Sequence, residues 1–265
     1  MLGRSLECSC SRGNAARWRL QQARWISAFP SFKIASLRRI IAERTSNNFN
    51  ESRVHEIGPD LAALEWLMEC GATKVEMSDG TAISSQREMR TYLKQKMDPA
   101  LSVRVSHASS SSHSSLRTLS RGDNAFTKKW PNAPKGVYLD KVDASDSAIA
   151  NEGFKYLREV HSLHKLKLNF CDYFGDEALR ELAGGRPANT LEDIEIVLNP
   201  SVSDGAVYSL TRLTALRRAH FYFLPYVSNR TAFIRAIKIA IPRCTVTFPE
   251  ATRIGYGYDE KELEK

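Results

Sequence analysis

The sequence has no run of about 18 consecutive apolar residues, the length that a membrane-spanning helix requires. We therefore expect any association with a membrane to be peripheral. Cysteine is also sparse, and its five residues fit no disulfide framework, because their spacings are unrelated. We interpret those that follow the first fifty residues as reduced thiols, as in a compartment where disulfides are rare. They are Cys70, Cys171 and Cys244.

The patterns on which catalysis depends are missing as well. There is no glycine-rich phosphate loop, no His-x-x-x-His metal pair and no visible pairing of a nucleophile with a base. The best candidate for a reactive thiol is Cys171, which we interpret as a structural residue for the reason given below. The sequence therefore predicts a protein that binds a partner and is not an enzyme, with no small-molecule substrate.

Acidic residues are scarce only in the N-terminal part of the chain. The net charge is +8, and residues 1–44 hold nine basic residues against two acidic ones. A nucleic-acid-binding protein should carry its basic surplus on the folded domain, so we expect no nucleic-acid partner. An arginine-rich, acid-poor segment with serine and alanine is typical of a mitochondrial transit peptide. We assign residues 1–35 to such a peptide, with a disordered basic tail as the alternative.

Residues 36–97 carry helical patterns and predict a small helical segment. The clearest begins at Gly58-Pro59-Asp60 and ends before Gly71. Proline is tolerated in the first turn of a helix, an acid there complements the helix dipole, and glycine suits the position just past the end. Its apolar residues recur at spacings of three and four and form one stripe. They are Leu61, Leu64, Leu67 and Met68.

Two segments are compositionally different from the rest. Serines crowd residues 102–121, where few apolar residues could offset the entropy of ordering. We predict a disordered, serine-rich insertion over residues 98–130. Residues 249–265 end in a charged stretch and are expected to form a polar tail.

From residue 136 onward the chain repeats itself. Three strand-like segments are each followed, five residues later, by a polar residue that opens a helical stretch, and a shorter unit with the same order precedes them. The polar residues that open the helices are spaced by 25, 28 and 25, and we predict that each caps its helix. They are Asn151, Asp176, Asp204 and Asn229.

This period belongs to leucine-rich repeats, in which L-x-x-L-x-L-x-x-N/C precedes a helix. Leu163 to Cys171 and Leu191 to Asn199 both satisfy the pattern. The N/C position holds a small buried side chain that bonds neighbouring turns of backbone, which is why we interpret Cys171 as structural. The predicted fold class is α/β: a short leucine-rich-repeat-like, right-handed solenoid over residues 136–248, with one parallel strand per repeat. Cys244–Phe248 would be its closing strand.

One run carries a resemblance to a known family. Ile57-Gly58-Pro59-Asp60-x-Ala62-Ala63-x-Glu65-Trp66-Leu67-x-x-Cys70-Gly71-Ala72 is similar to the mitochondrial ATP synthase subunit s (coupling factor B) family, which is related to complex I distal membrane-arm assembly component 2. The likeness resumes at Val142–Ser147 and at Gly153-Phe154, and continues weakly to about Phe248. It does not cover the serine-rich insertion.

The resemblance implies a peripheral protein on the matrix face of the mitochondrial inner membrane that supports proton-coupled ATP synthesis. It also implies one Mg²⁺, held by the backbone carbonyls of Gly71 and Ser145. Such ligands suit the ion, which prefers hard oxygen donors and keeps several waters. The chain departs from the family at Asn169-Phe170-Cys171, where the family has Cys-x-Cys, and this argues against a vicinal-dithiol role here.

Two alternatives keep the fold and change the client. The chain could be an assembly factor for a respiratory complex of the complex I type. It could also be a leucine-rich-repeat substrate adaptor of a ubiquitin ligase, although no F-box-like helical motif precedes the repeats. Sequence alone does not choose the client, because the same fold can present a surface to any partner.

Overall fold

A computed structural model describes residues 46–97 and 126–249, and all of them belong to one compact unit of the chain. The predicted transit peptide, most of the serine-rich insertion and nearly all of the polar tail lie outside the described residues. Within the described ranges, no helix combines the length and the apolar character needed to cross a bilayer.

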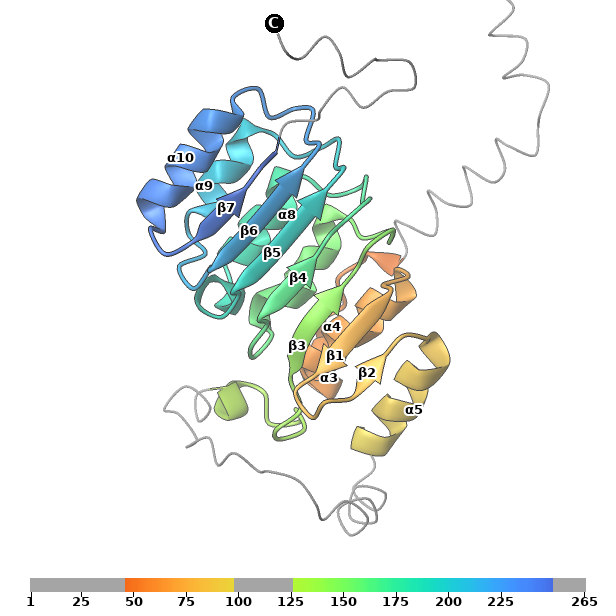
Figure 1. The fold of residues 1–265 in the computed structure, drawn as a ribbon. Coiled ribbons are helices and arrows are strands. Elements are labelled where there is room, and N and C mark those ends of the chain that lie inside the picture. Colours follow the sequence, from red (N-terminus) through yellow and green to blue (C-terminus); the bar gives the residue numbers. More distant parts are fainter. Residues whose placement is uncertain (1–45, 98–125, 250–265) are drawn as a thin grey trace, which may run out of the picture. The chain divides into compact units, whose positions relative to one another are not determined.

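Seven strands form one mixed sheet in the order β2-β1-β3-β4-β5-β6-β7 (Figure 1). The five strands from β3 to β7 are parallel, and the first two extend the sheet in antiparallel pairing. The prediction of an α/β fold with parallel strands is confirmed at this level. The strands are β1 (Lys74–Met77), β2 (Ala82–Ile83), β3 (Leu139–Asp143), β4 (Lys165–Lys167), β5 (Asp193–Val197), β6 (Arg218–Tyr222) and β7 (Thr245–Thr247).

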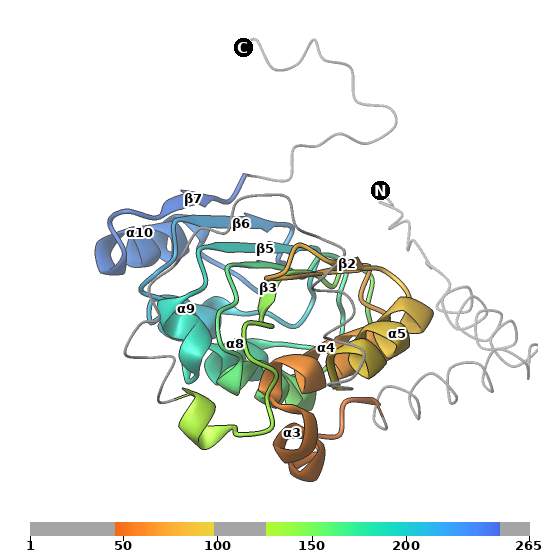
Figure 2. The same cartoon turned by 90° about the horizontal axis from the view of Figure 1, so that it is seen from below.

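The helices of the described residues cover one face of this sheet (Figure 2). Because side chains alternate between the two faces of a strand, every second residue of β4 to β7 packs against these helices. The α-helices are α3 (Glu51–Ile57), α4 (Pro59–Glu69), α5 (Gln86–Met97), α8 (Asp176–Ala183), α9 (Val207–Leu210) and α10 (Arg230–Ala240). The 3₁₀ helices are η1 (Asn151–Glu159), η2 (Arg186–Asn189) and η3 (Asp204–Ala206).

Equivalent residues of successive units meet in register. Leu166 pairs with Val142 on one side and with Ile194 on the other, and the row continues through β6 to β7. Every side chain of this row is buried on the helical face. The predicted one strand per unit is therefore confirmed for β3 to β6, and the predicted closing strand is confirmed as β7.

The predicted helix caps need a correction. Asn229 does cap α10, since its side chain accepts the N–H of Ala232. The side chains of Asn151, Asp176 and Asp204 instead accept backbone N–H groups from the loop of the following unit. The donors are Gly175 at 2.8 Å, Ser203 at 2.9 Å and Ser228 at 3.0 Å, respectively. These three residues therefore tie one unit to the next, and their helices begin after Ala150, Gly175 and Ser203.

The sequence predicted a helical segment over residues 36–97, but the described part of this segment is not purely helical. Its described part contains the hairpin of β1 and β2, whose pairing runs from Val75–Ile83 to Glu76–Ala82. Val75 and Ile83 are buried, and the hairpin continues the sheet next to β3. The hairpin therefore joins this segment to the repeating units through a shared sheet.

The C-terminal end of the predicted insertion is part of the core. Phe126 and Trp130 are 4% and 7% exposed, respectively. The Phe126 ring lies edge-on to His161, with 4.8 Å between centroids, and Trp130 lies 4.9 Å from His55. Residues 126–130 therefore belong to the folded unit.

Candidate functional site

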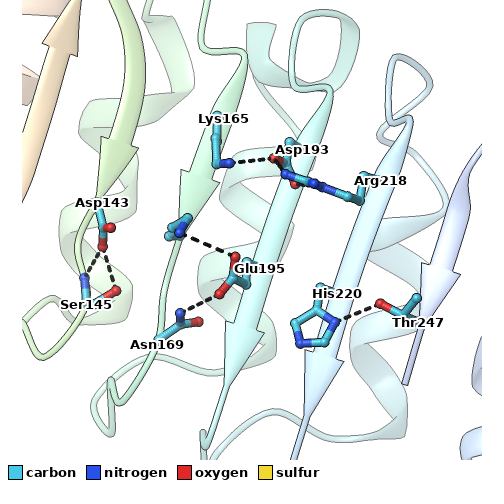
Figure 3. Close-up of polar contacts among 10 residues, drawn as sticks. Asp143, Ser145, Lys165, Asn169, Asp193, Glu195, Arg218, His220 and Thr247 are labelled. Atoms are coloured by element: carbon cyan, nitrogen blue, oxygen red, sulfur yellow. Dashed lines mark hydrogen bonds and ion pairs between the residues drawn. The ribbon is translucent and has the colours of Figure 1, made fainter. Parts of the chain in front are cut away.

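The face of the sheet that the described helices leave uncovered is lined by charged side chains (Figure 3). We call this surface the open face. At its first level, Lys165 of β4 reaches Asp193 of β5 at 3.0 Å, and Arg218 of β6 binds the same carboxylate from the other side. Partial burial opposes ionisation of Asp193, but the hydrogen bonds from Arg218 and Lys165 outweigh it and lower the pKa of Asp193.

A second level of the open face repeats the lysine of β4 and the acid of β5. Glu195 lies 3.7 Å from Lys167 and accepts a hydrogen bond from the Asn169 amide at 2.7 Å. His220 and Thr247 complete this level with a contact of 2.7 Å between the ring and the hydroxyl. Opposite charges thus face each other across the strands, which stabilises the sheet modestly and leaves a polar, hydrated surface.

A shallow hollow of about 230 Å³ lies where β1, β3 and β4 meet on the open face. Lys74 and Lys141 both bind Glu76, at 2.6 Å and 2.9 Å, and these two contacts lower the pKa of Glu76 to about 2. Four lysines and two acids line the hollow, so its lining holds more positive than negative side chains. Asp193 and Glu195 beside it pair with two of the lysines, Lys165 and Lys167. The charged residues are Lys74, Glu76, Lys141, Asp143, Lys165 and Lys167.

The two residues predicted as metal ligands lie on adjacent segments. Gly71 ends α4 at φ +86°, a conformation that glycine adopts without strain. On one side of it, the Cys70 carbonyl accepts the N–H of Ala148 at 2.9 Å. On the other side, the Thr73 hydroxyl donates to the Ser145 carbonyl at 2.9 Å. The structure therefore holds residues 70–73 and 145–148 side by side.

Some of the acidic side chains around these segments already accept hydrogen bonds within the protein. Asp143 accepts the N–H of Ser145 at 3.2 Å and its hydroxyl at 2.5 Å (Figure 3). Asp146, one residue further on, is exposed. Among residues 46–97 and 126–249, no three His, Cys, Asp or Glu side chains gather as a metal site. The predicted pair of main-chain carbonyls is a different kind of site. Its two segments are adjacent, and one of its carbonyls, that of Ser145, already accepts the Thr73 hydroxyl.

The three cysteines within the described residues are free and buried. Burial raises the pKa of each thiol, to about 12 for Cys70, which opposes the thiolate form that reacts. The Cys171 thiol donates to the Ala144 carbonyl at 3.1 Å, so it bonds a neighbouring turn of backbone as predicted. One unit later, the buried Asn199 amide donates to the Cys171 and Phe174 carbonyls.

The run that carries the family resemblance packs against the first repeating unit. The Trp66 indole donates to Asn47 at 3.2 Å and stacks on Tyr156 with 5.7 Å between centroids. Gly153 lies under this ring, where a Cβ atom would come within 2.4 Å of the indole. Only glycine leaves room at position 153 for the Trp66 indole, so α4 packs closely against η1 at this point.

Sequence reasoning did not identify the open face. A signal was present, because Lys165 and Lys167, and Asp193 and Glu195, alternate with buried aliphatic residues. Their pairing across strands depends on register, which a single sequence gives only indirectly.

The fold and the open face define a mixed α/β protein with one charged sheet surface that no described helix covers. No protein-family profile matches the chain. Curated relatives named "ATP synthase subunit s, mitochondrial" do match it. The one from Homo sapiens is 25% identical over 202 residues, which cover 74% of this chain and 78% of the relative. Those from Bos taurus and Mus musculus are 24% and 23% identical over 202 residues, with the same coverage.

Proposed function

We propose that the chain is a non-catalytic binding subunit of mitochondrial ATP synthase that supports proton-coupled ATP synthesis. The relatives' shared name supports the choice of client, and the coverage of three quarters of both chains supports a common fold. The observation that carries the proposal is the open face, a broad sheet surface whose charged side chains are presented by rigid strands. Such a surface suits recognition of another protein, since electrostatic complementarity gives specificity and faster association.

The repeating units support a leucine-rich-repeat-like, right-handed solenoid as the finer description of the fold. Each unit contributes a strand, a turn and a helical stretch, and polar side chains join each unit to the next. In repeat proteins the strand face is a common binding surface, because stacking leaves it free while the helices cover the other side. We place the client of this chain there.

The N-terminal composition and the relatives' name support a mitochondrial location for this protein. We propose import into mitochondria by residues 1–35 and a peripheral position on the matrix face of the inner membrane. An assembly factor for a respiratory complex of the complex I type is the alternative, and its client would bind the same open face. The experiment below includes that complex for this reason.

Removing positive charge from the open face should weaken binding to purified ATP synthase. The triple variant Lys141→Ala, Lys165→Ala and Lys167→Ala removes three positive charges from the lining of the hollow, and we expect at least about tenfold weaker binding. The matched control removes three exposed charges from the helical side. It is Lys155→Ala, Arg180→Ala and Lys238→Ala, and it should bind like the unchanged protein.

Binding is measured by surface plasmon resonance on immobilised ATP synthase, with purified complex I on a parallel surface. Equal losses in the two triple variants would contradict a site on the open face. Binding to complex I without binding to ATP synthase would replace the proposed client with the alternative one.

We further propose that Mg²⁺ bridges the segments of Gly71 and Ser145 through their carbonyl oxygens, with water completing its shell. The ion would supply a structural link between α4 and the first repeating unit. An ion that binds only the folded state raises the melting midpoint as its concentration rises. We expect this rise when Mg²⁺ replaces a chelator, and a smaller rise in Asp143→Ala, which removes nearby negative charge but no proposed ligand. A midpoint that stays constant up to about millimolar Mg²⁺ would contradict the site.

A further inference from the structure

Four residues at equivalent positions of successive units adopt the left-handed backbone conformation. Asp146, Phe170, Leu198 and Phe223 have φ of 56°, 59°, 57° and 49°. The first three each donate their N–H to the neighbouring strand, to the carbonyls of Asn169, Val197 and Tyr222, at 2.8 to 2.9 Å. The four residues therefore form one row along the edge where the parallel strands end, with one residue for each strand from β3 to β6.

The chemistry of this row changes along its length. The left-handed region accommodates asparagine, aspartate and glycine, whereas bulky side chains are strained there. Asp146 suits the conformation. Phe170, Leu198 and Phe223 do not, and they are 54%, 40% and 49% exposed, respectively. These three side chains are therefore unfavourable in two ways: the left-handed backbone strains them, and their apolar surface is exposed to water. We call them the apolar row. Their identity is better explained by a binding partner than by folding.

We propose that the apolar row binds an amphipathic α-helix of a partner protein, with a basic residue of that helix placed over Asp146. Neighbouring strands lie about 4.8 Å apart, and one helical turn rises about 5.4 Å. A helix laid across the strand ends can therefore present one apolar side chain per turn to one residue per strand. Three residues in the row correspond to about three turns, a contact of the kind that amphipathic helices make with apolar grooves.

The two ends of the apolar row fix the chemistry of the partner. Beyond Phe223 lies a hollow of about 170 Å³, which can receive one apolar side chain. Leu224, Pro225 and Phe248 also line it, together with Arg230, whose guanidinium lies over the Phe248 ring. Beyond Phe170 lies Asp146, whose carboxylate is exposed, with the carboxylate of Asp143 in the same turn. Opposite charge lowers the energy of a lysine or arginine placed there. The same acidic end disfavours an anionic lipid surface.

The apolar row lies at the strand ends and not on the open face, so this proposal does not depend on the proposed function. The probe is a fluorescent, alanine-rich helical peptide of about 18 residues with both ends blocked. Its leucines are spaced by four and three residues, and lysines fill its last turn. A second peptide carries glutamates in place of the lysines. Fluorescence anisotropy measures their binding to the full chain.

We expect saturable binding of the lysine peptide and weaker binding of the glutamate peptide. The triple variant Phe170→Asn, Leu198→Asn and Phe223→Asn should bind the lysine peptide at least about tenfold more weakly. Its melting midpoint should change by no more than a few degrees, because asparagine tolerates this conformation. Asp146→Asn should remove the preference between the two peptides. The control Tyr208→Asn with Ile239→Asn, which changes exposed apolar residues of α9 and α10, should leave binding intact.

Four results would overturn the proposal. The first is a large fall in the melting midpoint of the triple variant, which would make the apolar row structural. The second is unchanged peptide binding by that variant. The third is binding of the unchanged protein to phosphatidylcholine–cardiolipin vesicles that the triple variant loses. The fourth is a self-association in sedimentation that depends on the apolar row, which would make a second copy the occupant.

Discussion

Ile196→Asp is expected to destabilise the protein severely and to lower its urea midpoint far more than a substitution on the open face. Ile196 is fully buried on the helical face of β5, between the units that β4 and β6 supply. The substitution removes a packed aliphatic side chain and places a carboxylate where the surrounding core is apolar. Together these should cost about 4 kcal/mol or more, a large part of the stability of an ordinary domain. Leu168→Asp, one strand away, should have the same effect for the same reason.

Val197→Asp is the matched control, because Val197 is the next residue and points to the open face. Even beside Glu195, a second carboxylate on this solvated surface should cost no more than about 1 kcal/mol. Urea unfolding followed by circular dichroism measures both variants. Similar midpoints for Ile196→Asp and Val197→Asp would mean that the assignment of the two faces is wrong.

Asp60→Asn should become progressively more stabilising as pH rises. Asp60 is 4% exposed and accepts the N–H groups of Leu139 at 3.0 Å and of His161 at 3.2 Å. Burial raises the pKa of its carboxyl to about 7, against the hydrogen bonds that lower it. The folded state therefore holds this proton between about pH 4 and pH 7, where the unfolded chain has released it.

The sign of the effect follows from this difference. The stability that Asp60 contributes below about pH 4 is lost as the pH rises from about 4 to about 7. The pKa of Asp60 is about three units higher in the folded state than in the unfolded chain, and each unit corresponds to about 1.4 kcal/mol, so the loss is on the order of 4 kcal/mol. Asparagine has no such proton to lose, and any fixed cost of its amide is the same at every pH. We expect the midpoint of Asp60→Asn, relative to the unchanged protein, to rise between pH 5 and pH 8 in thermal melts. A constant difference across that range would contradict an ionisation cost at Asp60.

The parallel sheet could be predicted because its signals are local. Ile194 and Ile196 alternate with acids, the same alternation recurs at a regular interval, and a turn follows each time. Local signals did not decide what the polar residues between units bind. The Asp176 carboxylate could have capped its own helix, but it binds Ser203 in the next unit instead. Only the stacking of the units distinguishes the two outcomes.

The hairpin of β1 and β2 was missed although the sequence contains a signal for it. Asp79-Gly80 is a strong turn dipeptide, and Val75 and Met77 alternate with polar residues before it. The strands are short, and two residues of β2 are too few to show a period. The preceding helix signal was strong and extended the helical assignment too far along the chain.

The candidate site was predicted only in part. The resemblance pointed to Gly71 and Ser145, and the structure brings their segments together through hydrogen bonds that no spacing in the sequence reveals. The apolar row was not predicted at all. Its positions are visible in the repeat pattern, but the left-handed conformation of Phe170, Leu198 and Phe223 is a property of the folded backbone.

The most direct test of the proposed function is a cross-link from the open face inside mitochondria. Tyr222 lies on that face at the end of β6, and the photoreactive aromatic residue p-benzoylphenylalanine replaces it there. The matched control carries the same residue at Tyr208, on the helical side. Illumination followed by mass spectrometry identifies the attached protein. We expect attachment to subunits of ATP synthase from position 222 and not from position 208. Attachment from position 222 only to subunits of another respiratory complex, or equal attachment from both positions, would contradict it.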